Sequence, residues 1–348
     1  MTRIAAVAPV LPEYHYSQAE ITRELAPLIS TDPGRRAVLE RMHAASGIGT
    51  RYTALPLERY RDLGSFGETN DIFIEVATDL AERSVRDALD QAGFAASDVD
   101  FVLFTSVTGF SAPSIDALLV PRLGLRPDVK RLPSFGLGCV AGASGIARVH
   151  DYLVGHPDET GVLISVELCS LTLQRADETM ANFVATGLFG DGGAAVVMVG
   201  SGIESSGPRV VDTRSAFYPD TGDVIGWNVT TSGFEIVLTA GVADLIEGRF
   251  PDGVRSFLAD NGLTIDDIGC WIAHPGGPRV LDAFASALGL ARAVFAPSWA
   301  SLDRVGNLSS ASVLHVLADV GPQLSGTRGL LFALGPGVSA EFVLLEWP

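Results

Sequence analysis

Apolar and polar positions follow two different spacings along the chain, which together are typical of an α/β protein. Short apolar runs predict buried strands, and stretches with apolar residues every third or fourth position predict amphipathic helices. Strands are expected at residues 4–10, 100–106, 132–135, 161–166 and 194–199. Helices are expected at residues 17–26, 34–45, 70–93, 114–123 and in the stretch after Cys139. Pro27 is expected to end the first helix, and residues 47–53 are expected to form a loop.

The same pattern begins again after a glycine-rich break at residues 200–207. Residues 84–105 align with residues 253–274 at an offset of 169 positions. At an offset of 168 positions, Gly138-Cys139 falls on Gly306-Asn307. Ordered matches at a nearly constant offset indicate an internal duplication, and the period is far too long for a solenoid. We therefore expect two similar α/β halves, at residues 1–200 and 201–348, packed on each other.

Composition narrows the class of protein. The 348 residues are 47% hydrophobic and 19% charged, with a formal net charge of −17. This acidic balance argues against nucleic acid as a partner and against a basic membrane-binding face. An anionic substrate needs only a local basic patch. No apolar stretch approaches the roughly 20 residues of a membrane span, and Pro9 and Pro12 interrupt the N-terminal apolar run, so we expect a cytoplasmic protein without a membrane span.

Three cysteines carry most of the candidate chemistry. No two of Cys139, Cys169 and Cys270 are spaced as in a CxxC motif. Their spacing fits neither a disulfide framework nor a zinc site, and no metal is expected. Cys139 alone follows a Gly-Leu-Gly turn and precedes a helix of small residues. A sulfur at a helix N-terminus is favoured as a thiolate, and small residues allow the helix to pack against other backbone. The alternative is a buried structural cysteine.

The duplication brings three polar residues together. Cys139 and Asn307 occupy equivalent positions in the two halves, and His274 ends a strand of the second half. If the halves pack about a pseudo-twofold axis, these residues form a nucleophile, a base and an amide donor. The alternatives are a core histidine at His274 and a helix cap at Asn307. Asp191, which lies between glycines, is expected to form a turn.

The stretches around these residues resemble a known family. GLGCVAGASGIAR surrounds Cys139, IAHPGGPRVLDA contains His274, and GNLSSASVL contains Asn307. LFGDGGAAV and ALGPGVSAEFVLL add to the pattern. Over essentially its whole length the chain is similar to bacterial type III polyketide synthases, the chalcone synthase-like branch of the thiolase fold. The resemblance implies a five-layered αβαβα fold, a homodimer, acyl-CoA and malonyl-CoA as substrates, and no cofactor.

The resemblance also implies residue roles. Cys139 would accept the acyl group, while His274 and Asn307 would drive decarboxylation of malonyl-CoA and stabilise the resulting enolate, as an oxyanion hole does. Further matches are Phe189 and Phe234 as gatekeepers between a CoA tunnel and the cavity, Pro336 and Gly337 as a cavity loop, and Arg41 as a contact to CoA phosphate. Ala45 stands where plant relatives have a lysine. Phe189 and Phe234 could instead be plain core residues.

Six further positions bear on the substrate. Thr108, Ala112 and Cys169 match sites that open a tunnel for an acyl tail in mycobacterial relatives that form long-chain α-pyrones. Thr172, Glu167 and Ser309 match positions that shape the cavity and influence cyclisation. We therefore expect a long-chain acyl-CoA starter and an α-pyrone or resorcinol-type product. Malonyl-CoA as the starter, with a tetrahydroxynaphthalene-type product, is the second reading.

Two rival classes are disfavoured. A ketoacyl-ACP synthase III also uses Cys, His and Asn, but it usually carries HQAN at the histidine, where this chain has HPGG. A degenerate thiolase-fold subunit that serves only as a partner typically loses the nucleophile, whereas Cys139, His274 and Asn307 are all present here.

Overall fold

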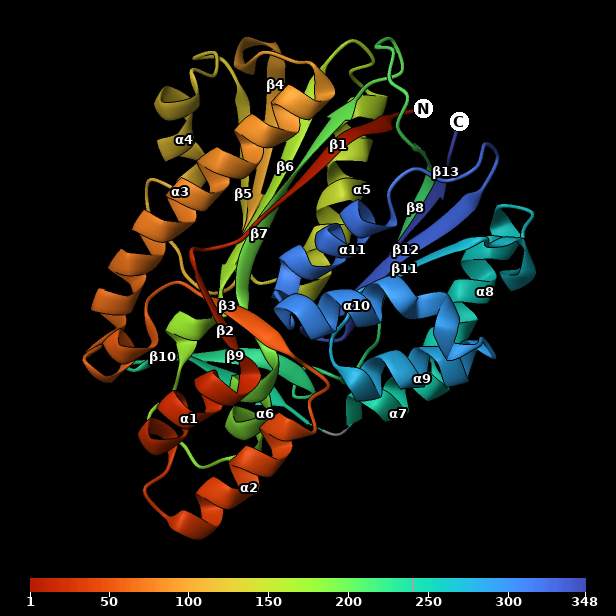
Figure 1. The fold of residues 1–348 in the computed structure, drawn as a ribbon. Helices are drawn as coiled ribbons and strands as arrows, with labels where there is room; N and C mark the ends of the chain where they lie inside the picture. The colour runs from red at the N-terminus through yellow and green to blue at the C-terminus, as the bar shows by residue number, and fades with distance from the viewer. Residues whose placement is uncertain (240) are drawn as a thin grey trace.

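A computed structural model describes residues 1–239 and 241–348 and centres on one large sheet. The N-terminal part supplies β1 (Arg3–Val10), β4 (Val99–Thr105), β5 (Lys130–Ser134), β6 (Thr160–Leu168) and β7 (Asp191–Val199). The C-terminal part supplies β8 (Arg209–Phe217), β11 (Cys270–Ala273), β12 (Arg328–Gly335) and β13 (Ser339–Glu346). Within the described residues these form a nine-stranded sheet in the order β11-β12-β13-β8-β1-β7-β6-β4-β5 (Figure 1).

The two parts of the sheet repeat one strand arrangement. β4 pairs parallel with β6, β6 pairs antiparallel with β7, and β7 pairs antiparallel with β1. β11, β12, β13 and β8 repeat this order with the same directions. The two sets join where Arg3 of β1 pairs with Arg209 of β8. The duplication predicted from the sequence is therefore present in the topology, with β5 as an additional edge strand.

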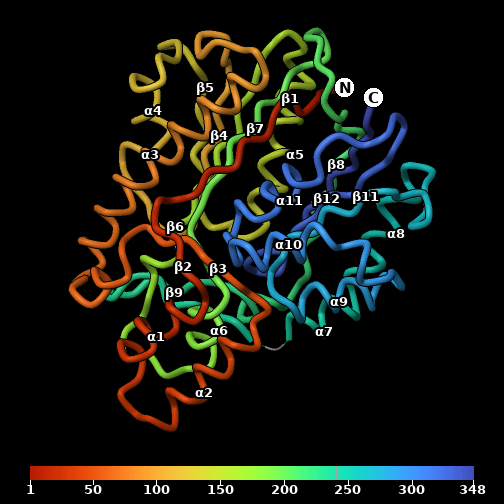
Figure 2. Tube along the Cα trace, in the orientation of Figure 1, coloured from red at the N-terminus to blue at the C-terminus, as the bar shows by residue number. Residues whose placement is uncertain are grey.

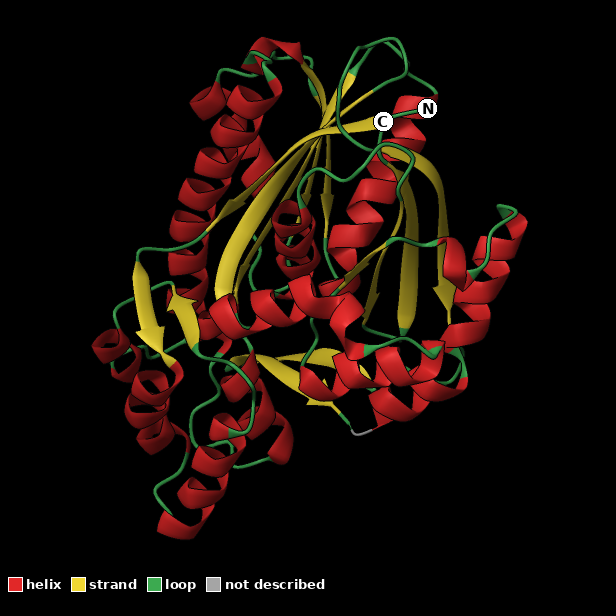
Figure 3. Cartoon of the chain, turned by 45° about the vertical axis from the view of Figure 1, so that its right-hand side comes forward, coloured by secondary structure: helices red, strands yellow, loops and turns green. Residues whose placement is uncertain are grey.

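Helices form three layers around the two parts of the sheet. α5 (Ala141–Val154) and α11 (Ser312–Val320) lie in the middle, where α5 contacts β6 and β13 while α11 contacts β1 and β11 (Figures 1 and 3). α3 (Phe66–Ala92) and α4 (Ile115–Leu123) cover the outer face of the first part. α8 (Phe250–Asp260) and α9 (Pro278–Leu288) pack with β12 and β13 on the other side. The result is the expected αβαβα order.

The remaining elements gather at one end of these layers. They are α1 (Gln18–Ile29), α2 (Pro33–Ala44), α6 (Met180–Leu188), α7 (Gly241–Gly248), α10 (Ala296–Val305) and the strand pairs β2 (Tyr14–Ser17) with β3 (Thr50–Thr53) and β9 (Ile225–Thr230) with β10 (Gly233–Leu238). The tube view places most of them below the sheet, while the N- and C-termini lie near each other at the top (Figure 2). The lower end is therefore where segments distant in sequence converge.

Helix α3 shows how local signals set an element. The hydroxyl of its N-cap Ser65 accepts a hydrogen bond from the backbone N–H of Glu68, and Gly93 ends the helix in the left-handed conformation, with a φ of 76°. Phe73, Ala77 and other apolar residues at helical spacing are buried against β1, β6 and β7. The prediction of this helix is confirmed, and the Ser65 cap explains why it begins four residues earlier than expected.

Two local predictions were wrong. Pro27 lies inside α1, which continues to Ile29, because burial of Leu25 and Ile29 outweighs the one hydrogen bond that proline removes. The expected loop at residues 47–53 contains β3, which pairs with β2. Neither of these four-residue strands has a long enough pattern to be distinguished from a loop in the sequence.

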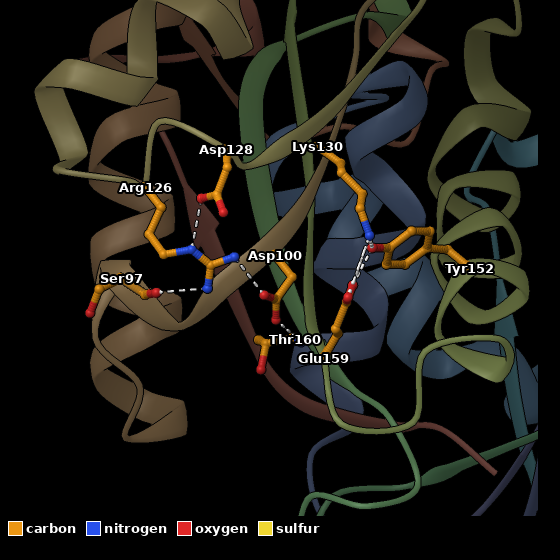
Figure 4. A network of polar contacts seen from close by, with 8 residues as sticks. All are labelled: Ser97, Asp100, Arg126, Asp128, Lys130, Tyr152, Glu159 and Thr160. Atoms are coloured by element: carbon orange, nitrogen blue, oxygen red, sulfur yellow. Dashed lines mark hydrogen bonds and ion pairs between the residues drawn. The ribbon is translucent and has the colours of Figure 1, made fainter.

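Polar contacts fasten the edge of the sheet where β4, β5 and β6 begin. Arg126 donates to Asp100, whose other oxygen accepts the backbone N–H of Thr160, so one carboxylate links β4 to the start of β6 (Figure 4). Lys130 of β5 lies 3.4 Å from Glu159 (Figure 4). Exposed pairs such as these contribute little stability individually.

The middle layer depends on close helix packing. A Cβ at position 142 in α5 would lie 2.2 Å from the carbonyl oxygen of Ser310 in the second half, and a Cβ at Gly145 would lie 2.4 Å from Leu163. The expectation that this helix packs against other backbone is therefore confirmed. Two glycines allow α5 to touch both halves at once.

Gly142→Ala should therefore destabilise the protein. Alanine would gain about 1 kcal/mol in helix propensity, but the clash with a backbone carbonyl should cost more, because overpacking typically costs about 1–3 kcal/mol even where side chains can yield. Urea and thermal unfolding measure the net loss. Gly248→Ala is the matched control, because a Cβ added at this end of α7 would meet no neighbouring atom within 4 Å. This variant should be neutral or stabilising. A Gly142→Ala variant as stable as the wild type would contradict this packing.

Candidate active site

Cys139 lies at the N-terminal end of the central helix. It sits in a 3-10 turn, Gly138–Val140, that leads directly into α5. Gly138 has a φ of 54°, and a Cβ there would lie 2.6 Å from Pro336 Cδ. A side chain at position 138 is thus excluded twice, by conformation and by contact. The predicted placement of the sulfur is confirmed, and the loop of Pro336 buttresses its turn.

His274 and Asn307 are presented by the second half. β11 ends one residue before His274, whose backbone N–H donates to Phe332 O at 2.9 Å. Asn307 follows α10 through Gly306, and its backbone N–H donates to Leu188 O at 2.8 Å. In return Gly190 N–H donates to Asn307 O at 3.0 Å. The end of α6 in the first half is therefore bonded directly to Asn307.

One cavity of about 730 Å³ joins these side chains. Seven predicted site residues line it, namely Arg41, Cys139, Phe189, His274, Asn307, Ser309 and Pro336. Cys139 Sγ lies 3.6 Å from Ser309 Oγ. Ser309 has a positive φ of 49°, which is uncommon for a residue other than glycine. The structure therefore brings the three expected catalytic residues onto one surface.

Burial disfavours the charged forms of Cys139 and His274. It raises the pKa of the Cys139 thiol to about 12 and lowers the pKa of His274 to about 3. Both ring nitrogens of His274 are buried without a hydrogen-bond partner among the described residues. Desolvation thus opposes the expected thiolate–imidazolium pair, and contacts of Cys139 with Ser309 and Asn307 act in the other direction. The ion pair stays a prediction.

Other predicted residues lie away from the main cavity. Cys169, Thr172 and Phe234 line a second cavity of about 40 Å³, which Phe189 also borders. Thr108 and Ala112, expected in an acyl tunnel, line neither cavity. Gly337, with a φ of 64°, follows Pro336 in the turn between β12 and β13 and lines neither cavity. Ala112 is exposed.

Buried hydrogen bonds explain the position of Thr108. Its hydroxyl donates to Glu167 at 2.9 Å and accepts the backbone N–H of Leu168. Glu167 also accepts from Ser106 and Ser310, and burial raises its pKa. Thr108 and Glu167 therefore belong to one buried hydrogen-bond network, and their roles in an acyl tunnel and in cyclisation stay predictions.

Three site features were missed or misread in the sequence. Trp227 borders both cavities and separates them, with its ring centroid 6.3 Å from those of Phe189 and Phe234. Arg279 lines the main cavity and is exposed like Arg41. Arg279 lies in the same HPGGPR stretch as His274, which could have revealed it. No signal in the sequence marked Trp227. Asp191, expected in a turn, is the buried first residue of β7 and accepts the N–H groups of residues 54 and 170.

A duplicated five-layered fold with Cys, His and Asn on one cavity is the architecture of thiolase-fold condensing enzymes. The chain matches the models of chalcone and stilbene synthases, with the N-terminal domain at residues 2–203 and the C-terminal domain at residues 209–347. It belongs to the chalcone and stilbene synthase family and is a type III polyketide synthase, an acyltransferase. None of the described helices could cross a membrane, and no group of three His, Cys, Asp or Glu side chains in the described part of the chain could hold a metal ion.

Individual relatives place the chain within the family. It is 51% identical over 352 residues to a 1,3,6,8-tetrahydroxynaphthalene synthase of Streptomyces peucetius subsp. caesius, covering 99% of this chain and 93% of the relative. It is 31% identical to the α-pyrone synthesis polyketide synthase-like Pks18 of Mycobacterium tuberculosis, covering 99% and 90%. The crystal structure of the tetrahydroxynaphthalene synthase of Streptomyces coelicolor A3(2) matches with a TM-score of 0.94 and 31% identity over 99% of both chains.

The site predicts that Cys139 alone carries the acyl group. Cys139→Ala should abolish covalent loading from an acyl-CoA, because the hydroxyl and amide groups around it supply no comparable nucleophile. Cys169→Ala and Cys270→Ala are matched controls and should load, since both thiols are buried outside the main cavity. Intact-protein mass spectrometry detects the adduct. An acyl adduct on Cys139→Ala at wild-type yield would disprove the assignment.

Proposed function

We propose that this chain is a malonyl-CoA-primed synthase of 1,3,6,8-tetrahydroxynaphthalene. The observation that carries the proposal is the 51% identity, over 99% of the chain, to a relative of that name. Identity to the α-pyrone-forming relative is only 31%. The second reading of the sequence is thus better supported than the long-chain acyl starter that we had expected first.

The shape of the site supports a small starter. The aromatic rings of Phe189, Trp227 and Phe234 stand between the main cavity and the small one, which has room for only about three water molecules. Thr108 and Ala112, which should line an acyl tunnel, lie outside both cavities. A starter tail of many carbons finds no space beyond this wall, whereas a chain built from malonyl units can fold within the main cavity.

The chemistry assigns a role to each catalytic side chain. Loading breaks the C–S bond of the CoA thioester and forms a bond to Cys139 Sγ, and CoA leaves with a proton. Decarboxylation of each extender malonyl-CoA builds negative charge on its thioester oxygen, to which His274 and Asn307 donate. The enolate carbon then attacks the acyl group on Cys139, which breaks the bond to Sγ, releases the cysteine and leaves the extended chain on CoA for transfer back to Cys139. Five malonyl units, each losing CO2, supply the ten carbons of a naphthalene, with five CoA and one water released.

Two arginines support CoA as the carrier. Arg41 and Arg279 are exposed at the main cavity, and neither forms an ion pair with another described residue. In a chain of net charge −17 they are a local positive site for phosphate groups. A cytoplasmic location, where CoA thioesters are made, is part of this proposal.

Incubation with malonyl-CoA as the only substrate tests the proposed product. Liquid chromatography with mass spectrometry should find tetrahydroxynaphthalene, or the quinone that air oxidation makes from it, and none with Cys139→Ala. Added palmitoyl-CoA should not divert malonyl units into a long-chain product, because the aromatic wall leaves its tail no space. Long-chain α-pyrones from palmitoyl-CoA, with no naphthalene from malonyl-CoA alone, would overturn the proposal.

We also propose that the enzyme is a homodimer joined at the β5 edge. Among the described residues β5 pairs only with β4, which leaves its other edge open. Four large apolar side chains on β5 or in contact with the segment that follows it are exposed, namely Phe110, Leu132, Phe135 and Leu137. Phe110 and Phe135 also pack on Phe234 at the second cavity, so a second copy seated here would stiffen the cavity wall. An open strand edge beside an apolar patch otherwise invites aggregation.

Leu132→Glu should shift the protein from dimer to monomer, because it places a charge on the open strand edge. Light scattering after size-exclusion chromatography gives the mass. Leu324→Glu, at a position 84% exposed in the segment before β12, is the control and should remain dimeric. A wild type that is monomeric at micromolar concentration, or a dimer unaffected by Leu132→Glu, would refute this interface.

A further inference from the structure

The Asn307 side chain is held by three hydrogen bonds. Its Oδ1 accepts the backbone N–H of Ser309 at 2.8 Å and the hydroxyl of Ser312 at 3.2 Å. Its Nδ2 donates to Gly276 O at 3.2 Å. An amide nitrogen carries two hydrogens, so one N–H is left free of the Gly276 bond, and Asn307 also contacts the Cys139 thiol. Since Asn307 lines the main cavity, this free N–H is the group available to a substrate oxygen.

The Ser312 hydroxyl determines which way this amide faces. Ser312 is fully buried at the start of α11, and its Oγ accepts the backbone N–H of Leu308 at 2.6 Å. That bond leaves the hydroxyl proton to be donated, and Asn307 Oδ1 is the acceptor it reaches. A flipped amide would set Nδ2 against two donors, the Ser309 N–H and the Ser312 O–H. The flipped form therefore loses both bonds to Oδ1.

The same network couples Asn307 to His274. Gly276 O accepts from Asn307 Nδ2, while Gly276 N–H donates to His274 O at 3.0 Å. In the unflipped orientation the Asn307 amide therefore keeps its hydrogen bond to Gly276, in the loop after His274. The Asn307 amide and the backbone of His274 are then both bonded to Gly276.

We propose that Ser312 is a positioning residue for decarboxylation. It holds the Asn307 amide so that its free N–H faces the oxygen on which charge develops. The inference rests on the proposed role of Asn307. Misplacing one donor within an oxyanion site costs roughly 10-fold or more in rate, less than deleting the donor, which costs about 10²–10³-fold.

Release of CO2 from malonyl-CoA by Ser312→Ala is the test. We expect kcat to fall roughly 10-fold with KM changed less than about twofold, and alkylation of Cys139 by iodoacetamide to be unchanged. Ser312→Thr keeps the hydroxyl and should restore most of the rate. Ser301→Ala removes an equally buried hydroxyl that has no partner among the described residues, and should leave decarboxylation unchanged.

A double-mutant cycle separates positioning from structural damage. In an Asn307→Ala background, Ser312→Ala should change the residual rate by less than about twofold, because the group it positions is gone. An equal loss in both backgrounds would overturn the proposal. Undiminished decarboxylation in Asn307→Ala would instead overturn the role of Asn307, and with it this inference. If Ser312→Ala does not fold, Ser312→Cys carries the same test, and wild-type decarboxylation in it would refute the role of Ser312.

Discussion

The close approach of α5 to the backbone just after Asn307 is the contact on which the rest of the structure depends. Gly142 lets the carbonyl of Ser310 come within a distance that no side chain would permit. Around this contact, the hydroxyl of Ser310 bonds to Ser165 at 2.8 Å and to buried Glu167, so polar groups of both halves satisfy one another in the interior. Because the nucleophile lies at the start of α5 and the amide just before α11, the distance between these helices sets the geometry of the site.

That geometry comes with a dry interior, which has opposite effects on the resting and reacting site. Burial disfavours charge on Cys139 and on His274, as their shifted pKa values show. The same low dielectric strengthens any hydrogen bond to a charge that develops during reaction. Asn307 is suited to such a site because it is neutral at every pH, and its orientation is fixed by Ser309 and Ser312. A carboxylate there would repel the enolate.

Much of the fold was predictable because its signals are local or repeated. The apolar pattern of α3, the glycine turn before Cys139 and the offset between the halves all survive in the structure. Prediction failed where tertiary packing decides. Pro27 stays helical because Ile29 is buried, and Asp191 begins β7 with its carboxylate bonded to residues 54 and 170 instead of forming a turn. Trp227 separates the two cavities because β9 packs against the end of α6 in the folded chain. No periodicity in the sequence predicts that contact.

In the proposed reaction, His274 and Asn307 of the second half donate to the thioester oxygen of a substrate held by the first half. A crystal structure of Cys139→Ala with malonyl-CoA bound tests it most directly. We expect the thioester oxygen to lie about 2.7–3.1 Å from Asn307 Nδ2 and from a ring nitrogen of His274, with Asn307 Oδ1 still bonded to Ser312. A thioester oxygen that points away from both residues, with malonyl density well defined in the main cavity, would contradict it.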